Sequence, residues 1–352
     1  MNKKHIAISL GLVAMTFSSC QKDDPVPATN ATSYADNISN IGLNVITETY
    51  KELASKASIL HTEAMNFKNA QTAANLDIAR NAWRDTRVPW EKSEGFLFGP
   101  VDTKGIDPAI DSWPVNKIDL DAVLSGTDDL TESFIDALSG ELKGYHTIEY
   151  LLWGGTGNKE MSDFTSREFD YLLAISENLK LKTRVLSDSW VPEGENYVMH
   201  LTEVGTSSSI YLSEKSALQE LVQGMVAIAD EVANGKINEP LSLQDLTKEE
   251  SQFSHNSKND FANNVRSISN VYNGKFNIGG LGIYDIVKEK DESLANRLND
   301  EITAAIIAID NIPGTFSDAV FNNKVSVTEA KDAVTTIQNT LESDILPIIS
   351  DL

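Results

Sequence analysis

The sequence predicts an all-α protein made of two helical bundles that pack together. Three observations lead to this prediction. Apolar residues recur at i, i+3 and i+4 over several long segments, runs that alternate as in a strand are scarce, and Gly- and Pro-rich stretches separate the helical segments. A chain of 352 residues is also long enough for two domains, each with its own core.

The first half begins with two long helical segments. One starts near residue 33 and continues toward Met65, and the second spans about 72–98 with Leu76, Ile78, Ala82 and Trp83 on its apolar face. Pro89 lies inside the second segment and is expected to kink or interrupt it. Residues 99–118 hold three prolines and two glycines, so we expect an ordered but irregular loop there.

The second half has the more regular periodicity. Apolar residues follow helical spacing in 217–233, 294–310 and 330–348, and one short extended piece is predicted near 196–201. Residues 189–197 contain Pro, Gly and polar residues, and we place the domain boundary there, with bundles at 33–192 and 193–352. Each half has a long helix pair followed by a Gly/Pro-rich interruption, which suggests a duplication.

The N-terminus is typical of a bacterial lipoprotein. Residues 1–19 have a basic start, an apolar run too short for a lasting membrane span, and small residues before Cys20 that resemble a lipobox. We expect lipidation at Cys20, a tether over 20–32, and anchoring in the outer membrane. Lys22, Asp23 and Asp24 resemble a surface-export signal, which favours the cell surface over the periplasmic face. The alternatives are a solvated tether with no export role and an ordinary secreted protein with an incidental cysteine.

The composition excludes some classes of function. There are 52 acidic and 29 basic residues, a formal net charge of −23, so the surface repels nucleic acid and attracts cations and basic partners. Cys20 is the single cysteine, which rules out an intramolecular disulfide and a cysteine-ligated metal site.

Residues 144–149 are the most informative short segment. His146 and Glu149 are three residues apart in an apolar helical stretch, so both lie on nearly the same helix face. They could ligate one metal ion, the Glu could orient the His for acid–base chemistry, or a buried His could simply be satisfied by its helix neighbour. Gly144 lets another backbone or a ligand come close. His200 and Glu203 have the same spacing, and we interpret that pair as structural.

Several motifs together resemble one known family. They are "AWRDTRVPWEKSEGFLFGPVD", "DPAIDSWP", "GYHTIEYLLWG" and, at 250–274, "ESQFSHNSKNDFANNVRSISNVYNG". The sequence resembles the imelysin-like family, also called peptidase family M75, whose G-x-H-x-x-E signature falls on Gly144, His146 and Glu149. Many relatives have a cysteine where this chain has Gln252, and a histidine where it has Lys258.

The resemblance implies an envelope protein of bacterial iron uptake with a G-x-H-x-x-E site near the interface of two helical domains. The expected ligand is iron or an iron-bearing ligand such as haem, and an outer-membrane receptor is an expected partner. The alternative is an M75 metallopeptidase that uses His146 and Glu149 with zinc. A zinc peptidase needs three protein ligands and a water, whereas this pair supplies at most two, so binding is favoured over catalysis. A third possibility is a protein-interaction module in which the motif is a structural hydrogen-bond network.

Other residues are candidates to complete the site. Glu94 follows Trp90 by four residues and is the predicted third metal ligand, unless it is an ordinary surface glutamate. Asp111 is either a cleft residue or a helix cap. The predicted binding cleft consists of Gly144, Asp111, Trp113, Trp90, Arg87, Ser254, Asn256 and Asp260. Arg87, with Arg84, could pair with these acids or hold an anionic ligand.

Overall fold

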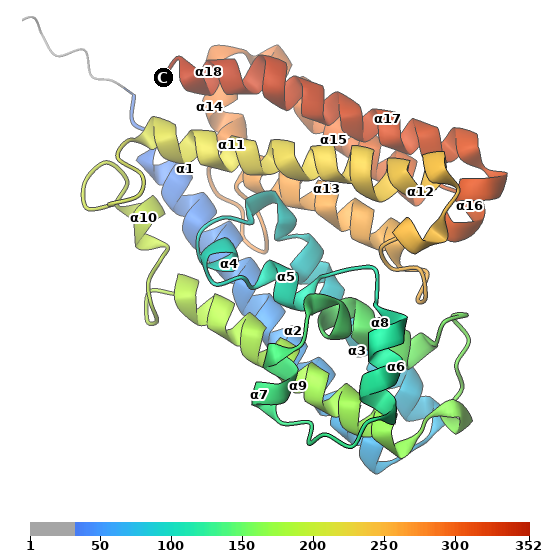
Figure 1. The fold of residues 1–352 in the computed structure, drawn as a ribbon. Helices are drawn as coiled ribbons and strands as arrows, with labels where there is room; N and C mark the ends of the chain where they lie inside the picture. Colours follow the sequence, from blue (N-terminus) through green and yellow to red (C-terminus); the bar gives the residue numbers. More distant parts are fainter. Residues whose placement is uncertain (1–31) are drawn as a thin grey trace, which may run out of the picture. The chain divides into compact units, whose positions relative to one another are not determined.

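The computed structural model describes residues 32–352, and Tyr34–Leu352 form one compact unit. The predicted signal peptide, Cys20 and nearly all of the predicted tether lie outside the described residues. Within 32–352 the chain forms helices and no strand, apart from one isolated β-bridge between Lys275 and Gly279 (Figure 1). The all-α prediction is therefore confirmed. None of the described helices combines the length and apolarity that crossing a membrane requires.

The elements up to residue 202 include three long helices and a series of short ones. They are α1 (Ala35–Asn40), η1 (Ile41–Thr47), α2 (Glu48–Asn69), α3 (Ala73–Glu91), η2 (Glu94–Phe96), α4 (Pro100–Thr103), α5 (Asp107–Ile110), α6 (Lys117–Ser125), α7 (Glu132–Ala137), η3 (Gly140–Leu142), α8 (Gly144–Trp153), η4 (Met161–Asp163), α9 (Ser166–Trp190) and α10 (Met199–Thr202).

The remaining elements are dominated by four long helices. They are α11 (Glu214–Asp230), η5 (Glu231–Ile237), α12 (Asn238–Leu243), η6 (Leu246–Lys248), α13 (Ser257–Asn273), α14 (Ile283–Lys290), α15 (Glu292–Asp310), α16 (Phe316–Asn322), α17 (Lys324–Thr340), η7 (Leu341–Ile345) and α18 (Leu346–Ser350). Of these, η1, η5 and η7 are π-helical turns that continue the helices before them.

The long helices form two groups that share a contact surface. In the first group α2 packs along both α3 and α9, and in the second α11, α13, α15 and α17 lie side by side (Figure 1). Helix α13 also contacts α3 and η2, so the two groups meet along this helix. The division of the chain into two domains near residue 193, and a duplication, stay predictions.

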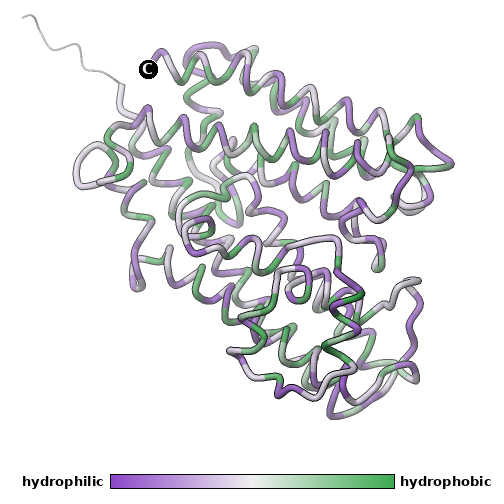
Figure 2. The backbone as a smooth tube through the Cα atoms, viewed as in Figure 1, coloured by the Kyte–Doolittle hydropathy of each residue, from purple (hydrophilic) through white to green (hydrophobic). Residues whose placement is uncertain are grey.

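Amphipathic periodicity explains how these helices pack. Hydrophobic and hydrophilic positions alternate along each long helix (Figure 2). In α11, Leu218, Leu221, Val222 and Met225 are fully buried, as the i, i+3, i+4 spacing predicts. Ile78 was expected on the apolar face of α3 but its side chain is 46 % exposed, so it lies on the outer surface.

Helix α3 includes Pro89 and ends at Glu91, so the helical segment expected over 72–98 is interrupted two residues after the proline. Two other local expectations differ from the structure. The predicted extended piece at 196–201 was wrong, since Met199–Thr202 form α10. Residues 99–118 are not wholly irregular, because α4 and α5 form there.

Gly144 fixes the approach of α8 to α5. Its φ is +74°, and a Cβ atom at this position would lie 2.2 Å from the carbonyl oxygen of Ile110. The glycine therefore lets the start of α8 rest on the backbone just before Asp111. The sequence-based expectation that another backbone comes close at Gly144 is confirmed.

Gly144→Ala is predicted to destabilise the fold more than Gly105→Ala. Both glycines have positive φ, but a Cβ at Gly105 would meet nothing within 4 Å. We expect a loss of about 1 kcal/mol for Gly105→Ala from backbone strain, and about 3 kcal/mol for Gly144→Ala, where a backbone clash is added. Urea unfolding of both variants measures this difference, and equal losses would contradict the packing role of Gly144.

Candidate metal centre

Eight charged or titratable side chains meet inside the protein where the two helix groups contact each other. None of these residues is more than 6 % exposed. They come from α3, η2, the residue after α5, α8, η5, the segment before α13, and α13 itself: Arg87, Glu91, Glu94, Asp111, His146, Lys236, Glu250 and Asp260.

Arg87 lies at the centre of this cluster. Its guanidinium forms ion pairs with Glu91, one turn along α3, and with Asp111. Its Nη2 lies 2.7 Å from Glu250 Oε1, and its Nε lies 3.5 Å from Asp260 Oδ1. One buried cation therefore holds four carboxylates from four parts of the chain, which the planar five-donor guanidinium is suited to do.

Lys236 is the second permanent cation of the cluster. Its Nζ lies 2.8 Å from Glu94 Oε2, 3.1 Å from Glu250 Oε1 and 3.6 Å from Glu91 Oε2. The side-chain amide of Asn264 donates to Glu91 Oε2 at 2.6 Å and to Glu94 Oε2 at 3.0 Å. Even so, burial raises the pKa values of Glu91 and Glu94 well above their usual range, although nearby cations oppose this rise.

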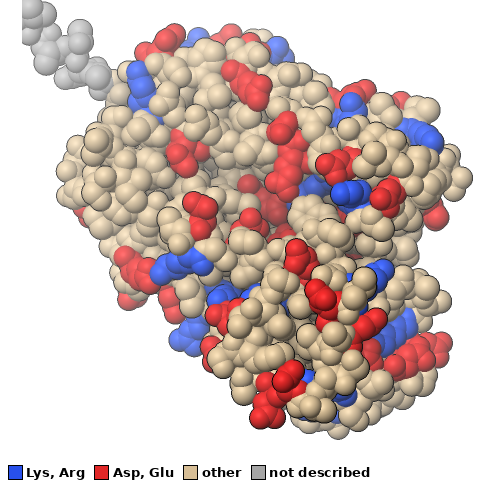
Figure 3. All heavy atoms as spheres, in the orientation of Figure 1, with Lys and Arg blue, Asp and Glu red and all other residues tan. Residues whose placement is uncertain are grey.

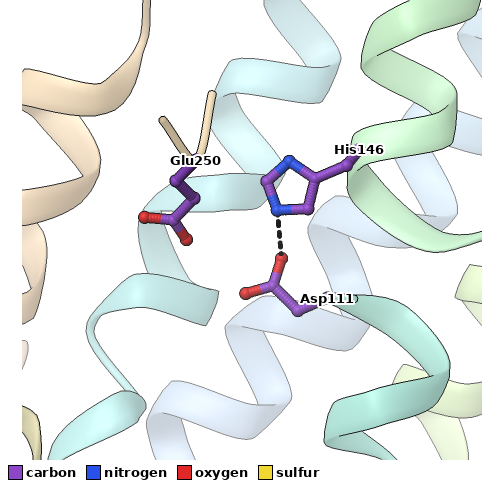
Figure 4. A group of neighbouring side chains, drawn as sticks. All are labelled: Asp111, His146 and Glu250. Atoms are coloured by element: carbon purple, nitrogen blue, oxygen red, sulfur yellow. Dashed lines mark ion pairs between the residues drawn. The ribbon is translucent and has the colours of Figure 1, made fainter. Parts of the chain in front are cut away.

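The His146 imidazole points at Asp111 (Figure 4), with Nε2 3.1 Å from Asp111 Oδ1. Trp90 Nε1 donates to Asp111 Oδ2 at 2.6 Å, and the Trp113 ring lies 5.7 Å from the imidazole. Burial lowers the pKa of His146, but hydrogen bonds with Asp111 and Glu149 outweigh burial and raise it to about 9. For Asp111 burial is outweighed by Arg87 and His146, which hold its pKa well below the usual range.

Glu149 connects the two sequence motifs. Its Oε2 lies 3.5 Å from His146 Nδ1. Its Oε1 accepts hydrogen bonds from Phe253 N at 3.1 Å, Ser254 N at 2.8 Å and Ser254 Oγ at 2.7 Å. The Glu149 carboxylate thus contacts the imidazole nitrogen that faces away from Asp111, and it connects α8 to the segment before α13. A carboxylate in this place is typical of residues that orient a metal-binding histidine.

Two overlapping groups of side chains could hold a cation. One consists of Asp111, His146 and Glu250, and the other of Glu91, Glu94, Asp111 and Glu250; within each group the potential ligand atoms lie within 4.8 Å of one another. The first group offers one imidazole with two carboxylates and the second offers carboxylates alone, and both kinds of set suit hard or borderline divalent cations. Glu149 belongs to neither group.

The charges of the cluster also fit a bound cation. Glu91, Glu94, Asp111, Glu250 and Asp260, if ionised, carry five negative charges against the two permanent positive charges of Arg87 and Lys236. Three charges then remain uncompensated, or two when His146 is protonated. Glu250 Oε2 and Asp260 Oδ2 are buried without a hydrogen-bond partner. Protons or a metal ion must make up this deficit, because buried unpaired carboxylates are costly.

Two surface pockets adjoin the cluster, and Glu94 lines both of them. One of about 240 Å³ is lined by acidic residues that include Glu94, Asp107, Asp111 and Glu231, and by Trp113. A second, of about 260 Å³, also touches Glu94 and Glu231 and runs along α11. Acidic side chains are prominent on this face of the molecule (Figure 3). A cation approaching here would meet negative charge.

The structure brings most of the predicted site residues together. Seven of the predicted residues lie in the cluster or in contact with it: Glu94, Asp111, His146, Trp90, Trp113, Arg87 and Asp260. Ser254 contacts Glu149, and Asn256 donates a hydrogen bond to Asp260 Oδ1 at 2.8 Å. Gly144 lets α8 pack against the backbone at Ile110. The metal-ligand roles of His146, Glu149 and Glu94 stay predictions. Asp111 is the C-cap residue of α5, where its backbone N–H donates to Asp107 O, while its carboxylate contacts Arg87 and Trp90 in the cluster.

Sequence reasoning missed three members of the cluster. Glu91 follows Arg87 by four residues, so the helical spacing already placed the two charges on one face. Lys236 lies between buried apolar positions at Ala233 and Ile237, where a lysine is unusual. Glu250 begins the second motif, but no local signal indicated its partners.

Comparisons with known proteins agree with this fold. A family model described as Imelysin matches residues 46–345. Iron-regulated protein A of Synechococcus elongatus is 30 % identical over 354 residues, which cover 98 % of this chain and 94 % of the relative. A crystal structure described as an iron-regulated protein A precursor from Parabacteroides distasonis has a TM-score of 0.77 and 25 % identity, covering 90 % of this chain and 96 % of that one. An imelysin-like protein from Psychrobacter arcticum has a TM-score of 0.72 at 14 % identity, covers 92 % of this chain and 98 % of that one, and shows the fold alone.

Arg87→Met is predicted to be among the most destabilising single substitutions in this protein. It would leave four carboxylates buried without their shared cation, which costs about 3–5 kcal/mol. Arg84→Met is the matched control, because Arg84 lies on the same helix, partly exposed and 4.8 Å from the Trp153 ring centre. We expect about 1 kcal/mol or less there. Urea unfolding measures the loss of stability in each of the two variants, and similar losses would contradict the central role of Arg87.

Glu249→Gln is predicted to change how stability depends on pH. Glu249 is fully buried and accepts hydrogen bonds from Ser257 and Ser317, and burial raises its pKa to about 7 from the ordinary 4.5. Between pH 4.5 and 7 the folded protein keeps a proton that the unfolded chain has released. Raising the pH through this window therefore lowers the free energy of unfolding, by about 3 kcal/mol in total.

The glutamine variant lacks this proton, so its stability relative to the wild type should rise from pH 4.5 to 7 and then level off. The control is Glu239→Gln, which replaces a glutamate at an exposed position. Denaturant unfolding measured across this pH range tests the prediction. Parallel profiles for the wild type and Glu249→Gln would contradict it.

Proposed function

Because this chain belongs to the imelysin family, we propose that it is an envelope protein of bacterial iron uptake that binds iron at the buried carboxylate–imidazole cluster. The name of its relative, iron-regulated protein A, supports a role connected with iron. The observation that carries the proposal is the convergence of Asp111, His146 and Glu250, with one buried Glu250 oxygen left without a partner.

The residues of the cluster would share the work of binding. Asp111, His146 and Glu250 would supply the ligand atoms, with Glu149 orienting the imidazole and Trp90 orienting the Asp111 carboxylate. Arg87 would keep the ligands in place when iron is absent. Because the pKa of His146 is raised to about 9, the imidazole holds a proton at neutral pH, and iron binding would release it.

The size of the site favours an ion over a larger ligand. The potential ligand atoms of Asp111, His146 and Glu250 are buried and lie within 4.8 Å of one another, a spacing that fits the coordination of one ion. A haem-type ligand is therefore the weaker form of the proposal. We further propose lipidation at Cys20 and residence in the outer membrane, on the cell surface rather than the periplasmic face, with an outer-membrane receptor as partner.

The M75 metallopeptidase remains the alternative, and the geometry favours binding over it. Glu149 would have to act as a general base, but one of its oxygens already accepts three hydrogen bonds and the residue is fully buried. Chelator-sensitive cleavage of an unstructured polypeptide that is lost in Glu149→Ala would favour the peptidase. Pull-down of a receptor that does not depend on His146 would favour the interaction module.

His146→Ala is predicted to abolish or strongly weaken iron binding. Calorimetric titration of the protein with ferrous iron under anaerobic conditions, and with ferric and zinc ions, should show saturable iron binding in the wild type. Losing an imidazole ligand should weaken it by about 100-fold or more, beyond the 10–100-fold typical of outer-sphere changes.

His200→Ala is the matched control for this titration. His200 has the same spacing to Glu203 as His146 has to Glu149, but its Nδ1 contacts Ser208 Oγ at 3.3 Å, outside the cluster. The control should bind iron as the wild type does. Absence of saturable iron binding in the wild type, or equal binding in both folded variants, would overturn the proposal.

A further inference from the structure

Lys236 lies where a metal ion would be expected. Three of the four carboxylates of the group Glu91, Glu94, Asp111 and Glu250 surround its ammonium, at 3.6, 2.8 and 3.1 Å for Glu91, Glu94 and Glu250. Its side chain is fully buried, so this cation is held away from solvent. A lysine in this position is a covalently attached counter-ion for a group of oxygens that could otherwise ligate a metal.

This four-carboxylate group adjoins the group that contains His146. Asp111 and Glu250 belong to both. Carboxylates that belong to two neighbouring sites can bridge two metal ions, as in two-metal centres. The Glu250 carboxylate lies across from His146 and Asp111 (Figure 4), and its Oε2 is buried without a hydrogen-bond partner. This unpaired buried oxygen is a second observation, besides the acidic cluster, that points to a cation ligand there.

The structure also offers the ammonium an alternative position. Glu231 Oε1 lies 3.8 Å from Lys236 Nζ, and the Glu231 side chain is 46 % exposed. Both residues belong to the π-helical turn η5, in which residues five apart are neighbours. Glu231 also lines both outer pockets. An outward rotation of the lysine side chain would therefore bring its ammonium toward Glu231 and open the inner position from the pocket side.

We propose that the cluster has a second divalent-cation position, formed by Glu91, Glu94, Asp111 and Glu250 next to the position at His146, and that Lys236 occupies it until a metal ion displaces its ammonium toward Glu231. This inference rests on the proposed function and adds a second ion and a built-in competitor. Ions that prefer oxygen ligands, such as Fe²⁺ and Mn²⁺, fit this all-carboxylate position.

Electrostatics explains why the lysine must move. An ammonium and a divalent ion a few ångströms apart repel strongly in a buried site of low effective dielectric constant. Replacing one positive charge by two among these carboxylates also reduces the deficit of positive charge described above. The lysine would thus keep the empty cluster stable and lower its affinity for a second ion.

Lys236→Met tests this role, because methionine is similar in length and shape and has no charge. The probes are Mn²⁺, and Fe²⁺ under anaerobic conditions, with metal analysis and calorimetry on the full folded chain. We expect a second ion to bind at least tenfold more tightly in Lys236→Met than in the wild type. Lys159→Met is the control, since this largely buried lysine pairs with Glu168 outside the cluster and should leave binding unchanged.

Two further measurements remain informative if Lys236→Met does not fold. In the wild type, saturation with Mn²⁺ should increase the acetylation of Lys236 by an amine reagent severalfold, as peptide mapping would show. Glu231→Gln, at a half-exposed position, should weaken the binding of the second ion severalfold and leave the affinity for the first ion unchanged.

The outcomes separate this inference from the proposed function. A wild type that binds no metal would overturn both. If the wild type binds one ion and folded Lys236→Met binds metal as the wild type does, the proposed second position is overturned and the proposed function is not. If that variant does not fold, a Lys236 that stays protected from acetylation at metal saturation would overturn it.

Discussion

The whole cluster depends on the ion pairs of the Arg87 guanidinium. Four carboxylates, from α3, from the residue after α5, from the segment before α13 and from α13, reach this one buried cation. Removing a carboxylate from water costs several kcal/mol, and only a shared cation with several donors can offset that for so many at once. The packing of α13 against α3 is therefore also the condition under which these acids can be buried together.

The two sequence motifs act as one unit in the folded protein. The first contributes His146 and Glu149 on α8, and the second contributes Glu250 together with the donors of Phe253 and Ser254 that hold Glu149. Gly144 allows α8 to rest on the backbone at Ile110, which places Asp111 opposite the imidazole. Each contact sets the position of the next, so the imidazole is held before any ligand arrives.

Negative charge exceeds positive charge both on the surface and inside. On the surface this excess surrounds the pockets that adjoin the cluster and would draw cations toward them. Inside, it leaves buried carboxylates short of partners, with the pKa values of Glu91 and Glu94 raised by burial and that of Asp260 raised to about 6. The proposed cation site would use this deficit of positive charge to attract its ion.

Local sequence determined the helices and the short-range pairs. Apolar spacing alone predicted the buried face of α11, and the spacing of three or four residues placed Glu149 beside His146 and Glu91 beside Arg87. Family motifs added Asp111 and Asp260 as candidates. Tertiary structure decided which distant groups meet: Glu250 reaches Arg87 across 163 residues and Lys236 reaches Glu94 across 142. Helical periodicity says which side of a helix is buried, but the partner of a buried charge depends on how whole helices pack, and that information is spread over the entire chain.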